Sequence, residues 1–252
     1  MRLHATEAGV GTPVVLLHGL FGSGQNFGTV QRRLSARFRA IALDLRNHGT
    51  SPHDPLMSYP AMAADVVETL RALDALPAVL IGHSMGGKVA MRAALDAPSL
   101  VRRLIVADIA PVAYPPRYRS FAEAMRTLRL EPGLTRAEAD AGLEALVPDA
   151  PVRAFLLQNL KLGAAPGWRI GLAAIEAALP ALEGWTAPEA AQYRGPTLFV
   201  AGARSDYIRP DVRGLIRALF PAARFATIKD AGHWVHAENP GAFVRVIESF
   251  LA

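Results

Sequence analysis

The fold of this chain is decided by the stretch Val79-Leu80-Ile81-Gly82-His83-Ser84-Met85-Gly86-Gly87. An apolar run ends at a serine set between two glycines, and an alanine-rich segment, Lys88 to Ala97, follows it. The pattern Gly-x-Ser-x-Gly is typical of a nucleophile elbow, a turn from strand to helix so tight that only glycine, without Cβ, fits beside the serine. It predicts that the hydroxyl of Ser84 projects above the end of a sheet, where it can act as a nucleophile.

Short apolar runs alternate with helical segments on both sides of this stretch. Continuous apolar runs of this length are typical of strands buried on both faces of a parallel sheet, and Tyr59 to Ala75 has the spacing of an amphipathic helix. The alternation predicts an α/β fold with a mostly parallel central sheet flanked by helices. The expected strands, with a weak edge strand first, are Arg2–Thr6, Val14–Leu17, Phe38–Leu43, Val101–Val106, Pro196–Ala201 and Arg224–Ile228.

The alternation stops between residues 111 and 194. No convincing strand occurs there, and proline and glycine separate segments that suit helices. We therefore expect a catalytic core made of residues 1–110 and 195–252, with residues 111–194 inserted as an all-helical cap. The expected cap helices are Tyr118–Leu130, Arg136–Leu146, Val152–Leu160 and Ile170–Leu179. The larger apolar side chains of the cap could line an acyl pocket or form the cap's own core, and the second is expected for most of them.

Composition narrows the class of protein. The chain has 252 residues, of which 51% are hydrophobic, and no cysteine, so one well-buried domain without disulfides or thiol chemistry is expected. The first residues lack the apolar centre of a signal peptide, and no apolar run is long enough to span a bilayer, so the expected location is the cytoplasm. The net charge of +5 comes from scattered arginines rather than a basic stripe, so no nucleic-acid partner is expected.

Several polar residues follow the expected strands, where ligands bind in a parallel sheet. A serine hydroxyl needs a general base and an acceptor that orients that base. Among the histidines, His233 follows the last strand and comes after the serine in chain order, so we expect it to be the base. The acid is either Asp108 or Asp206, each of which follows a strand.

The oxyanion hole requires two backbone N–H groups. One is expected from Met85, directly after the nucleophile, and the other from Leu20, in the glycine-rich loop His18-Gly19-Leu20-Phe21-Gly22. That loop lacks the glycine spacing of a phosphate-binding loop, so a phosphate site is not expected. His18 is expected to support the loop that it begins. Arg46-Asn47-His48-Gly49 is expected to brace the loop beside the active site, with direct contact to substrate as the alternative.

Four stretches together resemble the YbfF-type bacterial esterases and their mitochondrial relatives, which are α/β-hydrolases with a cap. The stretches are His18–Ser23, Asp44–Ser51, the Asp-Ile-Ala-Pro stretch within Ala107–Tyr114, and Ala231–Glu238. In that family the acid is the aspartate of Asp-Ile-Ala-Pro, and a serine occupies the later acidic position. The resemblance therefore implies Asp108 as the acid and Ser205 as a residue that hydrogen-bonds to His233.

The expected function is that of a serine carboxylesterase that forms an acyl-enzyme, with no metal ion or organic cofactor. The resemblance implies short-chain esters or thioesters, including acyl-CoA, as small-molecule substrates. Acyl-CoA thioesterase, lactonase and cofactor-free perhydrolase activity would use the same Ser-His-Asp triad. A non-catalytic ligand-binding protein on a hydrolase fold is the alternative from another class. The oligomeric state is left open.

Overall fold

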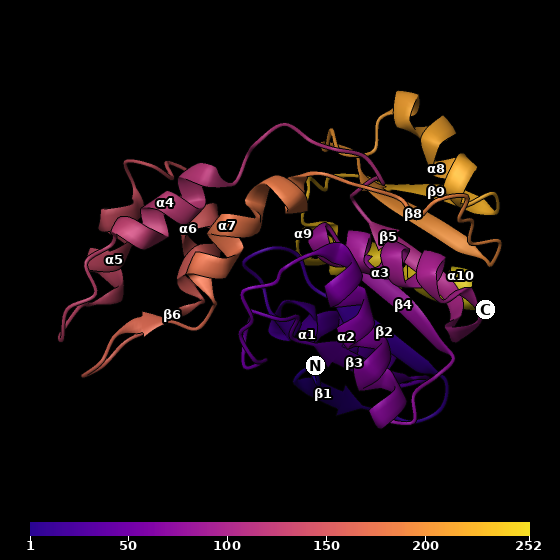
Figure 1. Ribbon diagram of the computed structural model, residues 1–252, viewed down its shortest axis with the longest axis horizontal. Coiled ribbons are helices and arrows are strands. Elements are labelled where there is room, and N and C mark those ends of the chain that lie inside the picture. Colours follow the sequence, from indigo (N-terminus) through magenta and orange to yellow (C-terminus); the bar gives the residue numbers. More distant parts are fainter.

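A computed structural model describes residues 1–252, and its centre is a seven-stranded sheet (Figure 1). The strand order is β1-β3-β2-β4-β5-β8-β9. Only β1 runs antiparallel to its neighbour, β3, and all other neighbouring pairs are parallel. The predicted α/β fold with a mostly parallel sheet is therefore confirmed. The strands are β1 (Ala5–Ala8), β2 (Pro13–Leu17), β3 (Arg39–Leu43), β4 (Ala78–His83), β5 (Val101–Ala107), β8 (Thr197–Gly202) and β9 (Ala223–Ile228).

Helices cover both faces of the sheet, and alternate side chains of each strand pack into different layers. On β2, Val15 and Leu17 join the hydrophobic cluster that includes residues of α2, α3 and α8, whereas Val14 and Leu16 join the cluster that includes residues of α1 and α10. The core helices are α1 (Gly28–Leu34), α2 (Tyr59–Ala72), α3 (Met85–Asp96), α8 (Arg213–Leu219), α9 (Val235–Glu238) and α10 (Pro240–Leu251), with 3₁₀ turns at Gly24–Phe27, Pro98–Leu100 and Pro210–Val212.

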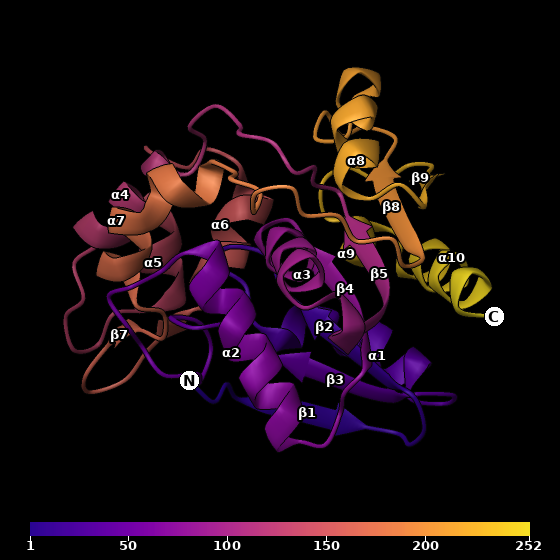
Figure 2. The same ribbon diagram turned by 45° about the vertical axis from the view of Figure 1, so that its right-hand side comes forward.

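The segment between β5 and β8 contains the helices expected there, grouped on one side of the sheet (Figures 1 and 2). Local caps start two of them. The side chain of Thr135 accepts a hydrogen bond from the amide of Glu138, and that of Asp149 accepts one from the amide of Val152. The helices are α4 (Arg119–Thr127), α5 (Arg136–Leu143), α6 (Ala150–Leu157) and α7 (Leu172–Glu183).

The insertion is not entirely helical, which corrects the expectation from the sequence. Strands β6 (Leu160–Lys161) and β7 (Gly167–Trp168) form a small antiparallel pair. Each strand has two residues, too few to show the alternation of apolar and polar side chains that marks a strand in a sequence. The expected helix from Val152 accordingly ends at Leu157 rather than continuing to Leu160.

The core elements differ from the predicted ranges mainly at their ends. The long amphipathic helix begins at Tyr59 as expected but ends at Ala72, because Asp74 has a positive φ of 50° that a helix cannot continue through. Helix α9, a single short turn after the last strand, was not expected. Measured by length and hydropathy, none of the helices could cross a bilayer.

Candidate active site

Ser84 lies on the turn between β4 and α3 with φ 51° and ψ −121°, in a region that residues other than glycine rarely adopt. Its amide donates to the carbonyl of Ala107 at 3.0 Å. A Cβ at Gly82 would lie 2.1 Å from the carbonyl oxygen of Gly86, and a Cβ at Gly86 would lie 2.2 Å from that of Leu17. Both glycines are therefore required by close backbone approach, as the motif predicted.

Asp108 and His233 form a direct pair. Oδ2 of Asp108 accepts a hydrogen bond from Nδ1 of His233 at 2.8 Å, which leaves Nε2 of the ring available on its other side. Asp108 is fully buried, and its Oδ1 accepts from the amide of Gly202 at 3.0 Å. The structure thus brings the aspartate after β5 to the histidine after β9, across the intervening end of β8.

Ser205 and Asp206 lie beside this pair but in different roles. The hydroxyl of Ser205 donates to Oδ2 of Asp108, so the expected hydrogen bond from Ser205 to His233 is corrected. The same oxygen already accepts from the histidine, and the serine therefore acts on the carboxylate rather than on the ring. Asp206 is 61% exposed and pairs with Arg117 at 2.8 Å.

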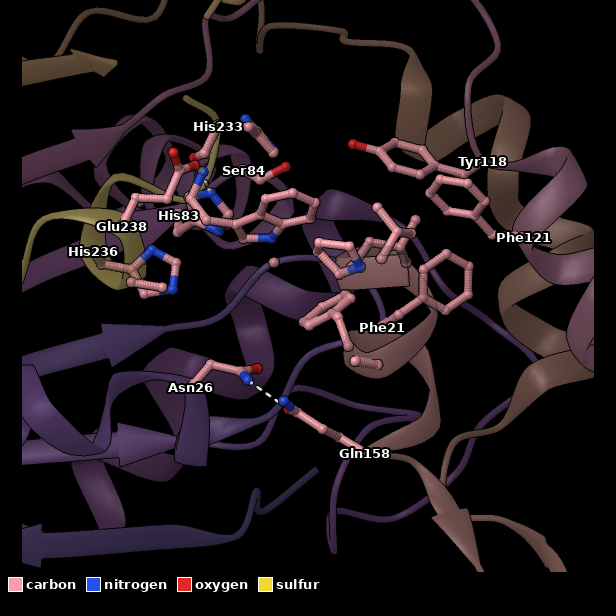
Figure 3. Close-up of a pocket in the computed structure, with 18 residues that line it drawn as sticks. Phe21, Asn26, His83, Ser84, Tyr118, Phe121, Gln158, His233, His236 and Glu238 are labelled. Atoms are coloured by element: carbon pink, nitrogen blue, oxygen red, sulfur yellow. Dashed lines mark hydrogen bonds between the residues drawn. The ribbon is translucent and has the colours of Figure 1, made fainter. Parts of the chain in front are cut away.

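Ser84 and His233 line the same pocket, and Figure 3 shows them next to each other at one end of it. No hydrogen bond joins them in the structure; such bonds are often long in enzymes without substrate. The hydroxyl of Tyr118 points toward Ser84 from the opposite wall of the pocket (Figure 3). It also lies 2.9 Å from the hydroxyl of Tyr207, whose ring stacks on His233 with centroids 4.1 Å apart.

The amides of Leu20 and Met85 donate no hydrogen bond to any group of the protein. Met85 is the first residue of α3, where N–H groups have no partner within the helix and carry partial positive charge. Leu20 lies in the loop after β2 and lines the pocket together with Ser84. Two buried, unused donors therefore border the serine, which is the arrangement that stabilises a developing oxyanion.

Two buried histidines hold the loop that carries Leu20. His18 bonds through Nδ1 to the carbonyl of Gly19 at 2.8 Å, and its Nε2 accepts from the amide of Leu45 at 2.9 Å. His48 donates from Nδ1 to the carbonyl of Arg46, and its Nε2 accepts from the amide of Phe21 at 3.2 Å. Burial lowers the pKa of both rings, that of His48 to about 3, so both are neutral and each acts as one donor and one acceptor.

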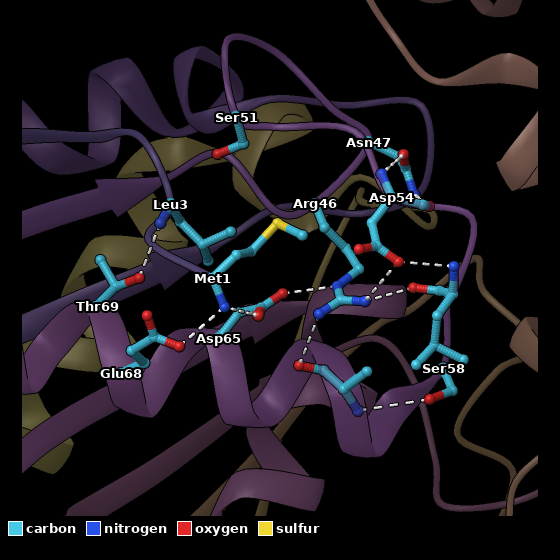
Figure 4. A network of polar contacts seen from close by, with 12 residues as sticks. Met1, Leu3, Arg46, Asn47, Ser51, Asp54, Ser58, Asp65, Glu68 and Thr69 are labelled. Carbon is cyan, nitrogen blue, oxygen red and sulfur yellow. Dashed lines mark hydrogen bonds and ion pairs between the residues drawn. The ribbon is translucent and has the colours of Figure 1, made fainter.

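Arg46 extends this support below the loop (Figure 4). Its Nε donates to Asp65 on α2 at 2.6 Å, and both side chains are buried. The other oxygen of Asp65 pairs with the ammonium group of Met1 at 2.6 Å. The amide of the neighbouring Asn47 side chain makes two hydrogen bonds with the backbone of Asp54. None of these residues lines the pocket. The segment from Arg46 to Gly49 therefore braces the site, as expected from the sequence.

The pocket has a volume of about 350 Å³, and half of the 18 residues that line it are hydrophobic. The insertion supplies much of the wall, including Phe121 from α4 and Phe155 from α6, while Phe21 and Trp234 come from the core. The other large side chains of the insertion pack elsewhere, as expected for most of them. Leu156, Leu157 and Leu160 are buried in the hydrophobic core, and Trp168 and Trp185 pack against it.

Sequence reasoning missed three residues at this site. Tyr118 and Tyr207 were not expected there, and only the position of Tyr207 two residues after Ser205 offered a signal. His236 lines the pocket, is 4% exposed, and has an unpartnered Nδ1. Burial lowers its pKa to about 3, so its ring is neutral.

Comparison with known proteins agrees with this fold and site. The family described as alpha/beta hydrolase fold matches residues 12–240. The sn-1-specific diacylglycerol lipase ABHD11 of Mus musculus is 41% identical over 249 residues, which cover 95% of this chain and 80% of the mouse protein. Esterase YbfF of Escherichia coli strain K12 is 39% identical over 241 residues, covering 95% of this chain and 93% of that protein. The solved structure titled marine microorganism esterase is 34% identical in sequence and has a TM-score of 0.96. The match covers 99% of this chain and 99% of that one.

The chain therefore belongs to the α/β-hydrolase fold family, and the resemblance to the YbfF-type esterases is confirmed. Within that superfamily it is an esterase or lipase, a serine hydrolase that acts on carboxylic esters.

Proposed function

We propose that this protein is a serine carboxylesterase in which Ser84 attacks the acyl carbonyl and forms an acyl-enzyme. His233 takes the proton from the serine, gives it to the leaving alcohol, and then activates the water that releases the acid. Asp108 orients the imidazole and stabilises its charged form during the reaction. The 2.8 Å hydrogen bond between Asp108 and His233, in the same pocket as the elbow serine, is the observation that carries this proposal.

The assignment of Asp108 rather than Asp206 as the acid is supported by burial. A fully buried carboxylate that accepts from His233, Ser205 and the amide of Gly202 is fixed in place, whereas Asp206 is largely in solvent. A fixed acceptor keeps the histidine in the tautomer with a free Nε2. The amides of Leu20 and Met85 are proposed to bind the oxyanion, which is supported by the absence of any other acceptor for them.

Residues 111–194 are proposed to act as a cap that closes the acyl pocket over a core made of residues 1–110 and 195–252. Phe121, Phe155 and Val152 supply an apolar wall, which suits the hydrocarbon part of an acyl chain better than a charged acid. We infer that the substrates are small-molecule esters with apolar acyl groups. Acylglycerols belong in the test panel because a relative is named as a diacylglycerol lipase.

Labelling with a fluorophosphonate probe tests the proposal directly. The wild-type protein is expected to react and the Ser84→Ala variant is expected not to react. Hydrolysis of p-nitrophenyl esters, acyl-CoA thioesters, a lactone and a diacylglycerol, each at graded acyl length, then separates carboxylesterase from thioesterase and lactonase activity. Perhydrolysis is assayed by adding hydrogen peroxide to an ester that the enzyme turns over. A wild-type protein that is folded but neither labelled nor active would favour the ligand-binding alternative.

A further inference from the structure

Lys88 is a buried lysine four residues after the nucleophile. It lies on the first turns of α3 with 1% of its surface exposed. Its Nζ donates to the carbonyls of Gly184, Glu183 and Leu182 at 2.7, 3.2 and 3.5 Å. These carbonyls end α7, the last helix of the insertion, and a cation at a helix C-terminus is favourable because the carbonyls there lack partners. One side chain of the core thus holds the end of the inserted segment.

The surroundings of Lys88 fit this role. The rings of Tyr59 and Tyr114 lie 5.5 and 5.1 Å from Nζ, close enough for cation–π contact. The hydroxyl of Tyr59 donates to the carbonyl of Leu182, one of the oxygens that Nζ also contacts. Burial lowers the pKa of Lys88 to about 7, while the nearby Glu183 opposes that shift. Burying an ammonium group is costly, and its three N–H donors are matched here by three carbonyls.

Glu183 carries the connection to the start of the insertion. Its Oε1 accepts from the amides of Arg117 and Tyr118 at 2.6 and 3.1 Å, just before α4 begins. Its own carbonyl also accepts from the amide of Tyr114 at 2.9 Å. The segment that enters the insertion and the segment that leaves it are therefore hydrogen-bonded to each other, and the second is also bonded to Lys88.

Tyr118 links this junction to the reacting groups. It is the residue before α4, and its hydroxyl points toward Ser84 (Figure 3). The same hydroxyl lies 2.9 Å from that of Tyr207, whose ring stacks on His233. Phe121, one turn further along α4, forms part of the acyl pocket. A shift at the junction would therefore move Tyr118 and the pocket wall together.

We propose that Lys88 and Glu183 are positioning residues that hold the start of α4, and with it Tyr118 and Phe121, in register with Ser84. Neither residue lines the apolar pocket that holds Phe121 and Phe155. They set the shape of the acyl pocket through the insertion, so their loss changes the binding of long acyl groups more than the chemistry at the serine. The inference rests on the proposed function only in using ester turnover as its readout.

The test compares Lys88→Met, Glu183→Ala and Glu183→Gln with the wild type on p-nitrophenyl acetate and p-nitrophenyl octanoate. Methionine preserves the length of the side chain without its charge, and glutamine retains the Oε1 acceptor that alanine removes. We expect KM for the octanoate to rise about tenfold in Lys88→Met and Glu183→Ala, the scale of coupling through packed networks, with acetate changed less than about threefold. Glu183→Gln should restore most of the octanoate activity. Hydrogen exchange of the α4 amides should quicken in the two impaired variants.

Arg92→Gln is the matched control, because Arg92 is a cation on the same helix that pairs only with Asp96. It should leave both substrates and the exchange of α4 unchanged. Equal losses on acetate and octanoate, or normal octanoate kinetics in Glu183→Ala, would overturn the proposal. If Lys88→Met does not fold, the comparison of Glu183→Ala with Glu183→Gln decides the question. Failure of the proposed function would appear separately, as a wild-type protein that fluorophosphonate does not label.

Discussion

The carboxylate of Asp206 forms an ion pair with the guanidinium of Arg117 at 2.8 Å, whereas the carboxylate of Asp108 holds His233. Asp108→Asn should therefore lower kcat by about 10³–10⁴, because an asparagine favours the wrong histidine tautomer. Asp206→Asn should change kcat/KM by less than about fivefold, since an exposed ion pair contributes little. Steady-state kinetics on one ester, with thermal unfolding to confirm folding, decides between them. A large loss in Asp206→Asn alone would show that the acid is misassigned.

The loop that carries Leu20 depends on His48, which accepts from the amide of Phe21. His48→Leu should leave that N–H buried without a partner, at a cost of about 1–3 kcal/mol in stability. Displacement of the adjacent Leu20 amide should lower kcat by about 10- to 100-fold, less than the roughly 10²–10³ expected when an oxyanion donor is removed outright. His4→Gln, at an exposed histidine, is the control for the loss of an imidazole. An unchanged kcat in a folded His48→Leu protein would show that His48 does not position the Leu20 amide for the reaction.

The acyl pocket should respond to the volume of Phe121. Phe121→Trp fills part of the cavity of about 350 Å³, and the longest acyl chain hydrolysed should become shorter. Phe121→Ala should have the opposite effect and raise the relative activity on long chains. Rates on p-nitrophenyl esters from acetate to laurate, each divided by the rate on acetate, give the measurement. Parallel profiles for both variants would mean that acyl chains bind elsewhere.

The buried neutral histidines predict acid sensitivity. Burial lowers the pKa of His48 and His236 from the ordinary 6.5 to about 3. Between these pKa values the unfolded chain binds protons that the folded chain does not, so stability is present above pH 6.5 and is lost as pH falls toward 3. From pH 7 to pH 5 each histidine should cost about 2 kcal/mol of unfolding free energy.

Urea unfolding at pH 7 and at pH 5 tests this sensitivity. His236→Phe retains an aromatic ring next to Phe27 and cannot bind a proton, so its free energy of unfolding should fall about 2 kcal/mol less than that of the wild type. Equal decreases in both proteins would place the acid sensitivity in other groups.

Local patterns in the sequence were enough to predict most of the core. Gly82 and Gly86 are required by contacts with adjacent backbone, so the elbow could be recognised without the rest of the fold. Residues 14–17 of β2 and all of β4 lie in the middle of the sheet with every side chain buried, and their apolar runs are therefore unbroken. The rule that sites lie at the carboxyl ends of parallel strands, together with the chain order of serine, acid and histidine, led to the expectation that His233 is the base.

What the sequence could not predict depends on how the insertion sits on the core. Lysine is rarely buried, so the sequence gives no reason to expect Lys88 beneath α7. Tyr118 and Tyr207 are far apart in the chain, and their contact exists only once both connections are in place. The hydroxyl of Ser205 was expected to bond to His233, but it donates to the oxygen of Asp108 to which the histidine also donates. The sequence places all three residues together but does not give the side-chain distances that decide which of them bond.

The side chain of Asn159, at the end of the insertion's third helix, donates to the carbonyl of Phe21 at 2.7 Å, and the amide of Gly171 donates to the carbonyl of Asn47 at 2.8 Å. The insertion is thereby hydrogen-bonded to two loops of the core. One carries Leu20, and the other, which contains Asn47, supports it. Chimeric enzymes made by exchanging this segment between relatives would need a compatible partner for each of these two carbonyls. Grafts chosen for pocket shape alone would transfer a preference for chain length and lose turnover at the same time.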